Sequence, residues 1–130
     1  MPLSAYLQAK LVNHLRGVTY IQPISYTVAL YSVSPSQTAA GTELSGAGYA
    51  RQPISLDIPN DYPANPLTFT TNVADITFPQ ATANWATARA YAIFDELGNQ
   101  LIYNPLKTTV TVTVGQSAVF YAGTLEIDWA

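Results

Sequence analysis

The sequence contains no cysteine, and it has one histidine and one methionine. Without cysteine there is no disulfide framework, thiolate metal site or cysteine nucleophile. No run of apolar residues reaches the roughly 18 that a membrane-spanning helix needs, and the first residues lack the basic flank and apolar stretch of a signal peptide. We therefore expect neither a membrane partner nor a signal peptide.

Charge is also scarce, because 10% of the 130 residues are charged, against about 25% in an ordinary globular domain. The formal net charge is -3, from five Lys+Arg and eight Asp+Glu. That balance leaves no basic surface for a run of phosphates, so nucleic-acid binding is not expected. With 48% hydrophobic residues, the chain can still bury one core. A surface with so few charges favours burial against another protein.

One amphipathic helix is predicted near the start, over residues 5–16. Ser4 is a suitable N-cap, and Leu7, Leu11 and Leu15 follow at helical spacing on one face. We expect this leucine stripe to cap the sandwich of its own subunit, with docking on a neighbouring chain as the alternative.

The period of the pattern changes from about 3.6 to 2 after the helix, and Gly, Pro, Asn and Ser recur at short intervals. Residues 24–31 and 87–95 alternate as strands do, and Gly98-Asn99 suits a hairpin turn. Residues 108–114 predict a further strand with its valines facing in and its threonines facing out.

About eight short strands with turns between them predict an antiparallel β-sandwich, jelly-roll-like in type. We expect a mainly β protein in which a short N-terminal helix, residues 1–17, precedes the sandwich, residues 18–130. No linker or internal repeat interrupts the sequence, so the whole chain is expected to form a single domain.

Few residues are suited to catalysis. His14 is the only imidazole, and no G-x-S-x-G motif presents a serine, so a Ser-His-Asp site is not supported. Glu126 and Asp128 share a strand face and could act on a sugar or hold Ca²⁺, but we favour a solvent-exposed face. We therefore expect no catalytic residue, no cofactor and no metal, and a protein that is not an enzyme.

Aromatic residues offer an alternative function. Trp85, Tyr91 and Tyr62 could stack on a sugar, as in a carbohydrate-binding module that recognises a receptor. In a β-rich chain with nine tyrosines such rings are more often core residues or cross-strand partners. We favour the second interpretation, and nothing else in the sequence supports a glycan partner.

Two blocks of sequence resemble a known family. Residues 41–52 read G-T-E-L-S-G-A-G-Y-A-R-Q, residues 78–85 read F-P-Q-A-T-A-N-W, and a hairpin segment follows at 92–103. Together with the opening helix, and in this order, they resemble the small phage virion proteins commonly called tail fibre protein. The resemblance covers nearly the whole chain, and residues 59–74, which are proline-rich, depart from it.

The resemblance implies a non-enzymatic structural protein of the virion, a β-sandwich on its exterior in several copies, assembled in the host cytoplasm. The partners it implies are other copies of the chain, for example in a trimer, and other proteins of the capsid or tail. Attachment to the tail or baseplate and decoration of the capsid both remain open. If the protein recognises a host receptor instead, the carbohydrate-binding alternative applies.

Some residues are candidate assembly contacts. Tyr49 can cover a sheet edge, and the planar guanidinium of Arg51 suits an acidic residue or backbone carbonyls. A plain turn with a surface arginine is an equally open interpretation of this block. The full set of candidates is Leu7, Leu11, Leu15, Tyr49, Arg51 and Trp85.

Overall fold

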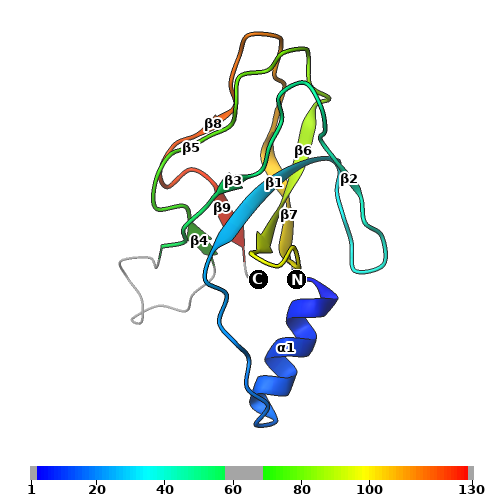
Figure 1. Ribbon diagram of the computed structural model, residues 1–130, viewed down its shortest axis with the longest axis vertical. Helices are drawn as coiled ribbons and strands as arrows, with labels where there is room; N and C mark the ends of the chain where they lie inside the picture. The colour runs from blue at the N-terminus through cyan, green and yellow to red at the C-terminus, as the bar shows by residue number, and fades with distance from the viewer. Residues whose placement is uncertain (1–2, 58–68, 129–130) are drawn as a thin grey trace.

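The computed structural model describes residues 3–57 and 69–128, and Figure 1 shows their arrangement. The fold is mainly β, with one short helix and antiparallel sheets, so the predicted sandwich-like fold class is confirmed. The elements in chain order are α1 (Ala5–Leu15), β1 (Tyr26–Val33), β2 (Thr42–Glu43), β3 (Gln52–Pro53), β4 (Phe69–Thr71), β5 (Ile76–Thr77), β6 (Ala88–Asp95), β7 (Gln100–Val110), β8 (Val119–Phe120) and β9 (Glu126–Asp128).

The main sheet has the order β2-β1-β6-β7, and β3 also pairs with β1. Strand β6 lies between β1 and β7, and its turn into β7 is the predicted hairpin turn. Gly98 has a φ of 83°, and the Asp95 side chain accepts the backbone N–H groups of Leu97 at 3.0 Å and of Asn99 at 2.8 Å. The buried carboxylate therefore fixes this turn from inside.

The core lies between the main sheet and two smaller pairs, β4 with β9 and β5 with β8. Alternate residues of β1 and β6 point into it, as the period of two predicts. The largest fully buried side chains are those of Tyr91, Phe78, Leu30, Ile93, Ile127, Val28 and Asn72. The opposite face of β1 and β6 carries a second cluster, made of Ala29, Tyr31, Ala90, Ala92 and Phe94, with Tyr103 packed against it.

The prediction for residues 108–114 was wrong in part. Strand β7 runs without a break from the hairpin to Val110, and it stops there because its partner β6 begins at Ala88, which is paired with Val110. Beyond that point the backbone bonds to a loop instead, with the Trp85 N–H donating to the Val112 carbonyl at 2.9 Å. Val112 is buried, whereas Val114 is 61% exposed.

The helix is confirmed, with Ser4 as its N-cap: the Ser4 hydroxyl accepts the N–H of Leu7 at 3.1 Å. The backbone N–H of Ser4 donates to the Leu101 carbonyl at 2.8 Å, which ties the start of α1 to β7. From there the helix leads away from the sheets (Figure 1). The favoured expectation of a cap on its own sandwich therefore holds at Leu7, which is buried, but not at Leu15, which is 86% exposed.

Across residues 3–57 and 69–128, no helix has the length and apolar character needed to cross a membrane.

Candidate functional site: the edge loop and the helical arm

The outer edge of β1 carries two short strands in succession. Strand β2 pairs with β1 at Tyr31 and Val33, and β3 pairs with it at Thr27 and Val28. Residues 44–51, here called the edge loop, leave the sheet after β2 and return to it at β3. The Leu44 N–H still donates to the Leu30 carbonyl at 2.9 Å, but the pairing along this edge is interrupted at the Leu30 N–H.

Tyr49 fills this interruption. Its hydroxyl accepts the backbone N–H of Leu30 at 2.9 Å and donates to the Glu43 carboxylate at 2.8 Å. Because Leu30 is fully buried, an unpaired N–H there would cost about 1–3 kcal/mol. Burial raises the pKa of the Tyr49 phenol well above its ordinary value, and the bond to Glu43 adds to the rise. The hydroxyl therefore stays protonated and able to donate.

Glu43 and Arg51 hold the two ends of the edge loop together. The guanidinium forms a two-pronged ion pair, with Nε 2.9 Å from Oε2 and Nη2 2.8 Å from Oε1 of Glu43. It also lies over the Phe94 ring, 3.8 Å from the ring centroid. Burial would raise the pKa of Glu43, but the hydrogen bonds from Arg51 and Tyr49 and the charge of Arg51 outweigh it and lower that pKa.

The tip of the edge loop is a turn in an unusual backbone conformation. Gly46, Ala47 and Gly48 have successive positive φ values of 68°, 52° and 83°. The carbonyl of Ala47 accepts the N–H of Thr82 and the indole N–H of Trp85, both at 2.9 Å. The two blocks that carry the family resemblance, residues 41–52 and 78–85, therefore meet at this turn.

Aromatic rings continue the contact into the core. The Tyr49 ring stacks on Phe78 with centroids 6.1 Å apart and meets Trp85 edge-on at 5.5 Å. Trp85 is 7% exposed and Tyr91 is 1% exposed, so neither ring is available to stack on a sugar. Tyr62, the third ring of the carbohydrate alternative, lies outside the described residues.

The six candidate assembly contacts fall into two places. Tyr49, Arg51 and Trp85 gather around the edge loop, while the three leucines lie along α1. Within each place only part of the set reaches the surface: Arg51, Leu11 and Leu15 are exposed. Sequence reasoning missed Glu43 and Phe94 as the partners of Arg51. Glu43 could have been found from the sequence, because an acid and an arginine stand at opposite ends of a glycine-rich turn. Nothing near Arg51 in the sequence marks Phe94 as its partner.

Of the two carboxylates that the sequence places on one strand face, the structure describes the side chain of Glu126. Glu126 is ion-paired with Lys107 at 2.8 Å, and the side chain of Asp128 lies outside the described residues. In the ranges 3–57 and 69–128, no three His, Asp or Glu residues are grouped as metal ligands. His14 lies exposed on α1.

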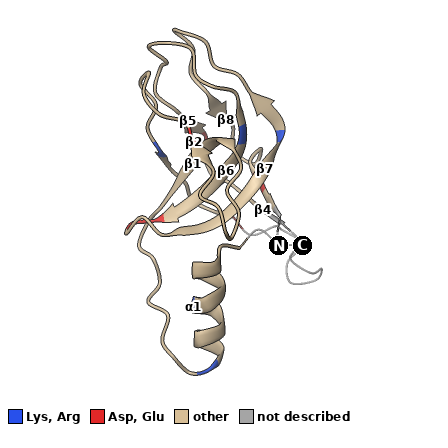
Figure 2. Cartoon of the chain, turned by 90° about the vertical axis from the view of Figure 1, so that its right-hand side faces the viewer, with Lys and Arg blue, Asp and Glu red and all other residues tan. Residues whose placement is uncertain are grey.

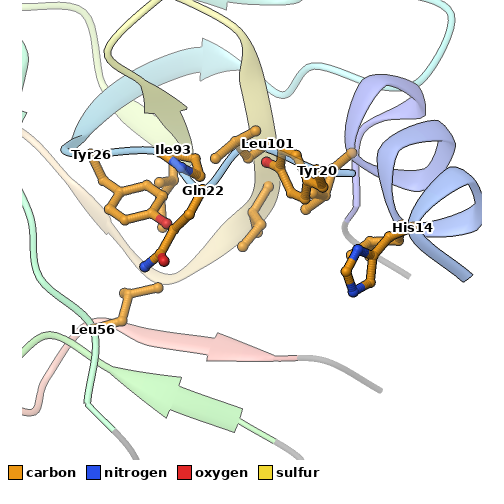
Figure 3. Close-up of a pocket in the computed structure, with 11 residues that line it drawn as sticks. His14, Tyr20, Gln22, Tyr26, Leu56, Ile93 and Leu101 are labelled. Atoms are coloured by element: carbon orange, nitrogen blue, oxygen red, sulfur yellow. The ribbon is translucent and has the colours of Figure 1, made fainter. Parts of the chain in front are cut away.

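The helix and the chain that returns from it border an apolar groove of about 380 Å³. In Figure 3, His14 and Tyr20 lie on the side of the helix, while Leu56, Ile93 and Tyr26 lie on the side of the sheets. We call residues 4–24 the helical arm. The groove therefore opens between the helical arm and the base of the sandwich.

The comparison with known families covers all the helices and strands described above. A family model described as "Podophage GP4 fiber I protein gp80" matches residues 2–128. No curated protein matches the chain. The family match begins before α1 and reaches the last residue of β9. The chain therefore belongs to the family of the podophage GP4 fiber I protein gp80, a family of bacteriophage fibre proteins.

Proposed function

We propose that the protein is a non-enzymatic structural component of a bacteriophage virion, an oligomeric β-sandwich carried on the exterior of the particle. It is attached to the tail or baseplate as a fibre-type protein, or it decorates the capsid. The observation that carries this proposal is the match of residues 2–128 to a phage fibre family.

The edge loop supports a structural role. An open sheet edge invites pairing with other chains, and proteins protect such edges with short strands and covering loops. Here β2 and β3 are two residues each, and Tyr49 occupies the interruption between them. The ion pair of Glu43 and Arg51 then holds the loop in place. A closed edge limits uncontrolled pairing in a protein that is present in many copies.

The low charge of the chain supports burial against other proteins. The end of β7 and the residues just beyond it carry threonines such as Thr109, Thr111 and Thr113, which are exposed. Burying uncharged residues avoids the cost of removing unpaired charges from water. We propose other copies of the chain and other virion proteins as the partners, with Leu11, Leu15 and Arg51 as contacts at the surface and Leu7, Tyr49 and Trp85 as the residues that position them.

The test compares phage that carry the gene for this protein with phage in which that gene is disrupted. Electron cryo-microscopy of the two particles should show a β-rich density on the exterior of the first that is missing from the second, on the tail or on the capsid. Identical particles would contradict the proposal. Re-supply of the wild-type protein from a plasmid should restore the density.

A further inference from the structure

Exposed apolar side chains concentrate on the helical arm. Isolated apolar residues on a surface are ordinary, but a contiguous group marks an interaction site. Three of those on the arm are almost fully exposed: Leu15 at 86%, Ile21 at 83% and Ile24 at 88%. Half of the large apolar residues that the structure shows as exposed lie in this short segment, namely Leu11, Val12, Leu15, Val18, Ile21 and Ile24.

The charge of the helical arm is opposite to that of the rest of the chain. The arm carries Lys10 and Arg16 and no acidic residue, since the first acid of the sequence is Glu43. The remaining residues hold all eight Asp+Glu and three of the five Lys+Arg, so the formal charge is +2 on the arm and 3 − 8 = -5 elsewhere. Figure 2 shows a basic position at the end of the arm that points away from the sandwich, whereas Lys10 lines a pocket together with Asp95 and Glu96.

The two cations of the arm are not used for ion pairs within residues 3–57 and 69–128. Arg16 donates to the amide oxygen of Asn13 at 3.2 Å, and Lys10 lies 5.5 Å from the centre of the Tyr6 ring. Both contacts are with neighbours on the same helix. The arm is therefore apolar and cationic, and its charges remain available to an acidic surface.

We propose that the helical arm of one copy docks on the sandwich of a neighbouring copy, an inference that rests on the oligomeric role proposed above. Charge complementarity selects the sandwich: contact between two arms would bring like charges together, whereas the sandwich carries the opposite charge. The receiving surface is the apolar groove between the base of the sandwich and that copy's own arm. Tyr20 and Pro23 of this groove also line a pocket with Glu96, an exposed acid of the sandwich.

Such a contact joins two different surfaces, so it closes into a ring when the rotation between copies allows it. A stable interface uses roughly 20–30 residues on each side. Because Ser4 and Leu7 are buried in their own subunit, the rest of the arm supplies part of this number and residues of the sandwich supply the remainder.

The first test measures the mass of the full chain by light scattering after size-exclusion chromatography. The variant L15E/I21E places two acids at two exposed apolar residues of the arm, and V73E/V114E places the same two charges on exposed valines elsewhere. We expect the wild type and V73E/V114E to share one oligomeric mass and L15E/I21E to be a monomer with an unchanged circular dichroism spectrum. An oligomer that persists in L15E/I21E, or a monomeric wild type, overturns the inference.

The second test separates docking on the sandwich from pairing between arms. The variant R16E reverses a charge on the arm, and R89E makes the same change at an exposed position of β6. Docking on the acidic sandwich predicts that R16E weakens association, whereas R89E makes the sandwich more acidic and should not weaken it. Stronger association of R16E, as expected when repulsion between two arms is relieved, would overturn the inference.

Failure of this inference is distinguishable from failure of the proposed function. If the protein is present in virions but L15E/I21E leaves its oligomeric mass unchanged, the structural role stands and the arm contact is wrong. If the protein is absent from virions, the proposed structural role is wrong, whatever the mass of the protein in solution.

Discussion

The hydroxyl of Tyr49 accepts the backbone N–H of Leu30 at 2.9 Å, in the place where a neighbouring strand would otherwise supply a carbonyl. A side chain thus completes the hydrogen bonding of β1 between β2 and β3. The same hydroxyl donates to Glu43, which is held by Arg51. The edge of the main sheet, the edge loop and the ion pair are therefore one connected unit.

Removing this hydroxyl tests the unit directly. Tyr49→Phe keeps the ring in its contacts with Phe78 and Trp85 but leaves the N–H of Leu30 without its acceptor. We expect the free energy of unfolding to fall by about 1–3 kcal/mol, measured by urea denaturation followed by tryptophan fluorescence. Tyr121→Phe, at a ring that is 64% exposed, is the matched control and should change little. Equal stability of the two variants would contradict the role given to Tyr49.

Arg51 is expected to resist replacement by lysine. Arg51→Lys keeps the positive charge but loses the two-pronged pair with Glu43 and the flat contact with Phe94. We expect a loss of about 1 kcal/mol in unfolding free energy, because the pair is partly exposed to solvent. The same change at the exposed Arg89 should be near neutral. A lysine at position 51 that stabilises as well as arginine would show that only charge matters there.

The lowered pKa of Glu43 predicts a pH dependence. A carboxyl whose pKa is lower in the folded state stabilises the fold above its unfolded pKa, and this contribution is lost as the pH falls through the folded value. The stability difference between the wild type and Glu43→Gln should therefore be largest at neutral pH and should shrink well below pH 4.5, the ordinary carboxyl value. Urea midpoints measured across this range check it.

The Arg51→Ala background supplies the control for that series. Without the guanidinium, Glu43→Gln should cost less at neutral pH, because residues in one network are not additive. An unchanged cost in this background would mean that Arg51 is not what lowers the pKa of Glu43.

The two glycines of the edge loop should differ in their tolerance of alanine. Both have positive φ, which costs a residue with a Cβ about 1–2 kcal/mol. At Gly46 a Cβ would meet nothing within 4 Å, whereas at Gly48 it would lie 2.8 Å from the carbonyl oxygen of Gln80. We expect Gly46→Ala to lower the melting temperature modestly and Gly48→Ala to lower it clearly more. The reverse order would contradict the close approach of residues 78–85.

Local features of the sequence predicted the helix and the hairpin turn. Ser4 and the spacing of Leu7 mark α1, and Gly98-Asn99 marks the turn, because a cap or a turn depends on residues close in sequence. The end of β7 was not predictable in this way. It depends on where β6 begins, which the residues after Val110 do not encode.

The site was predictable only as a set of residues. Tyr49, Arg51 and Trp85 stand out in the sequence, but the amide that Tyr49 completes and the ring on which Arg51 lies are 19 and 43 positions away (49 − 30 and 94 − 51). Contacts of this kind depend on tertiary packing. Likewise, the leucine spacing of α1 predicts an apolar face but not whether that face lies on its own sandwich.

The measurement that most directly tests the structural role is the number of copies of this protein in purified virions, by quantitative mass spectrometry relative to the major capsid protein. A structural component of the virion is expected at a fixed copy number per particle: hundreds for decoration of the capsid, a handful for attachment to the tail. Absence of the protein from purified particles would contradict it.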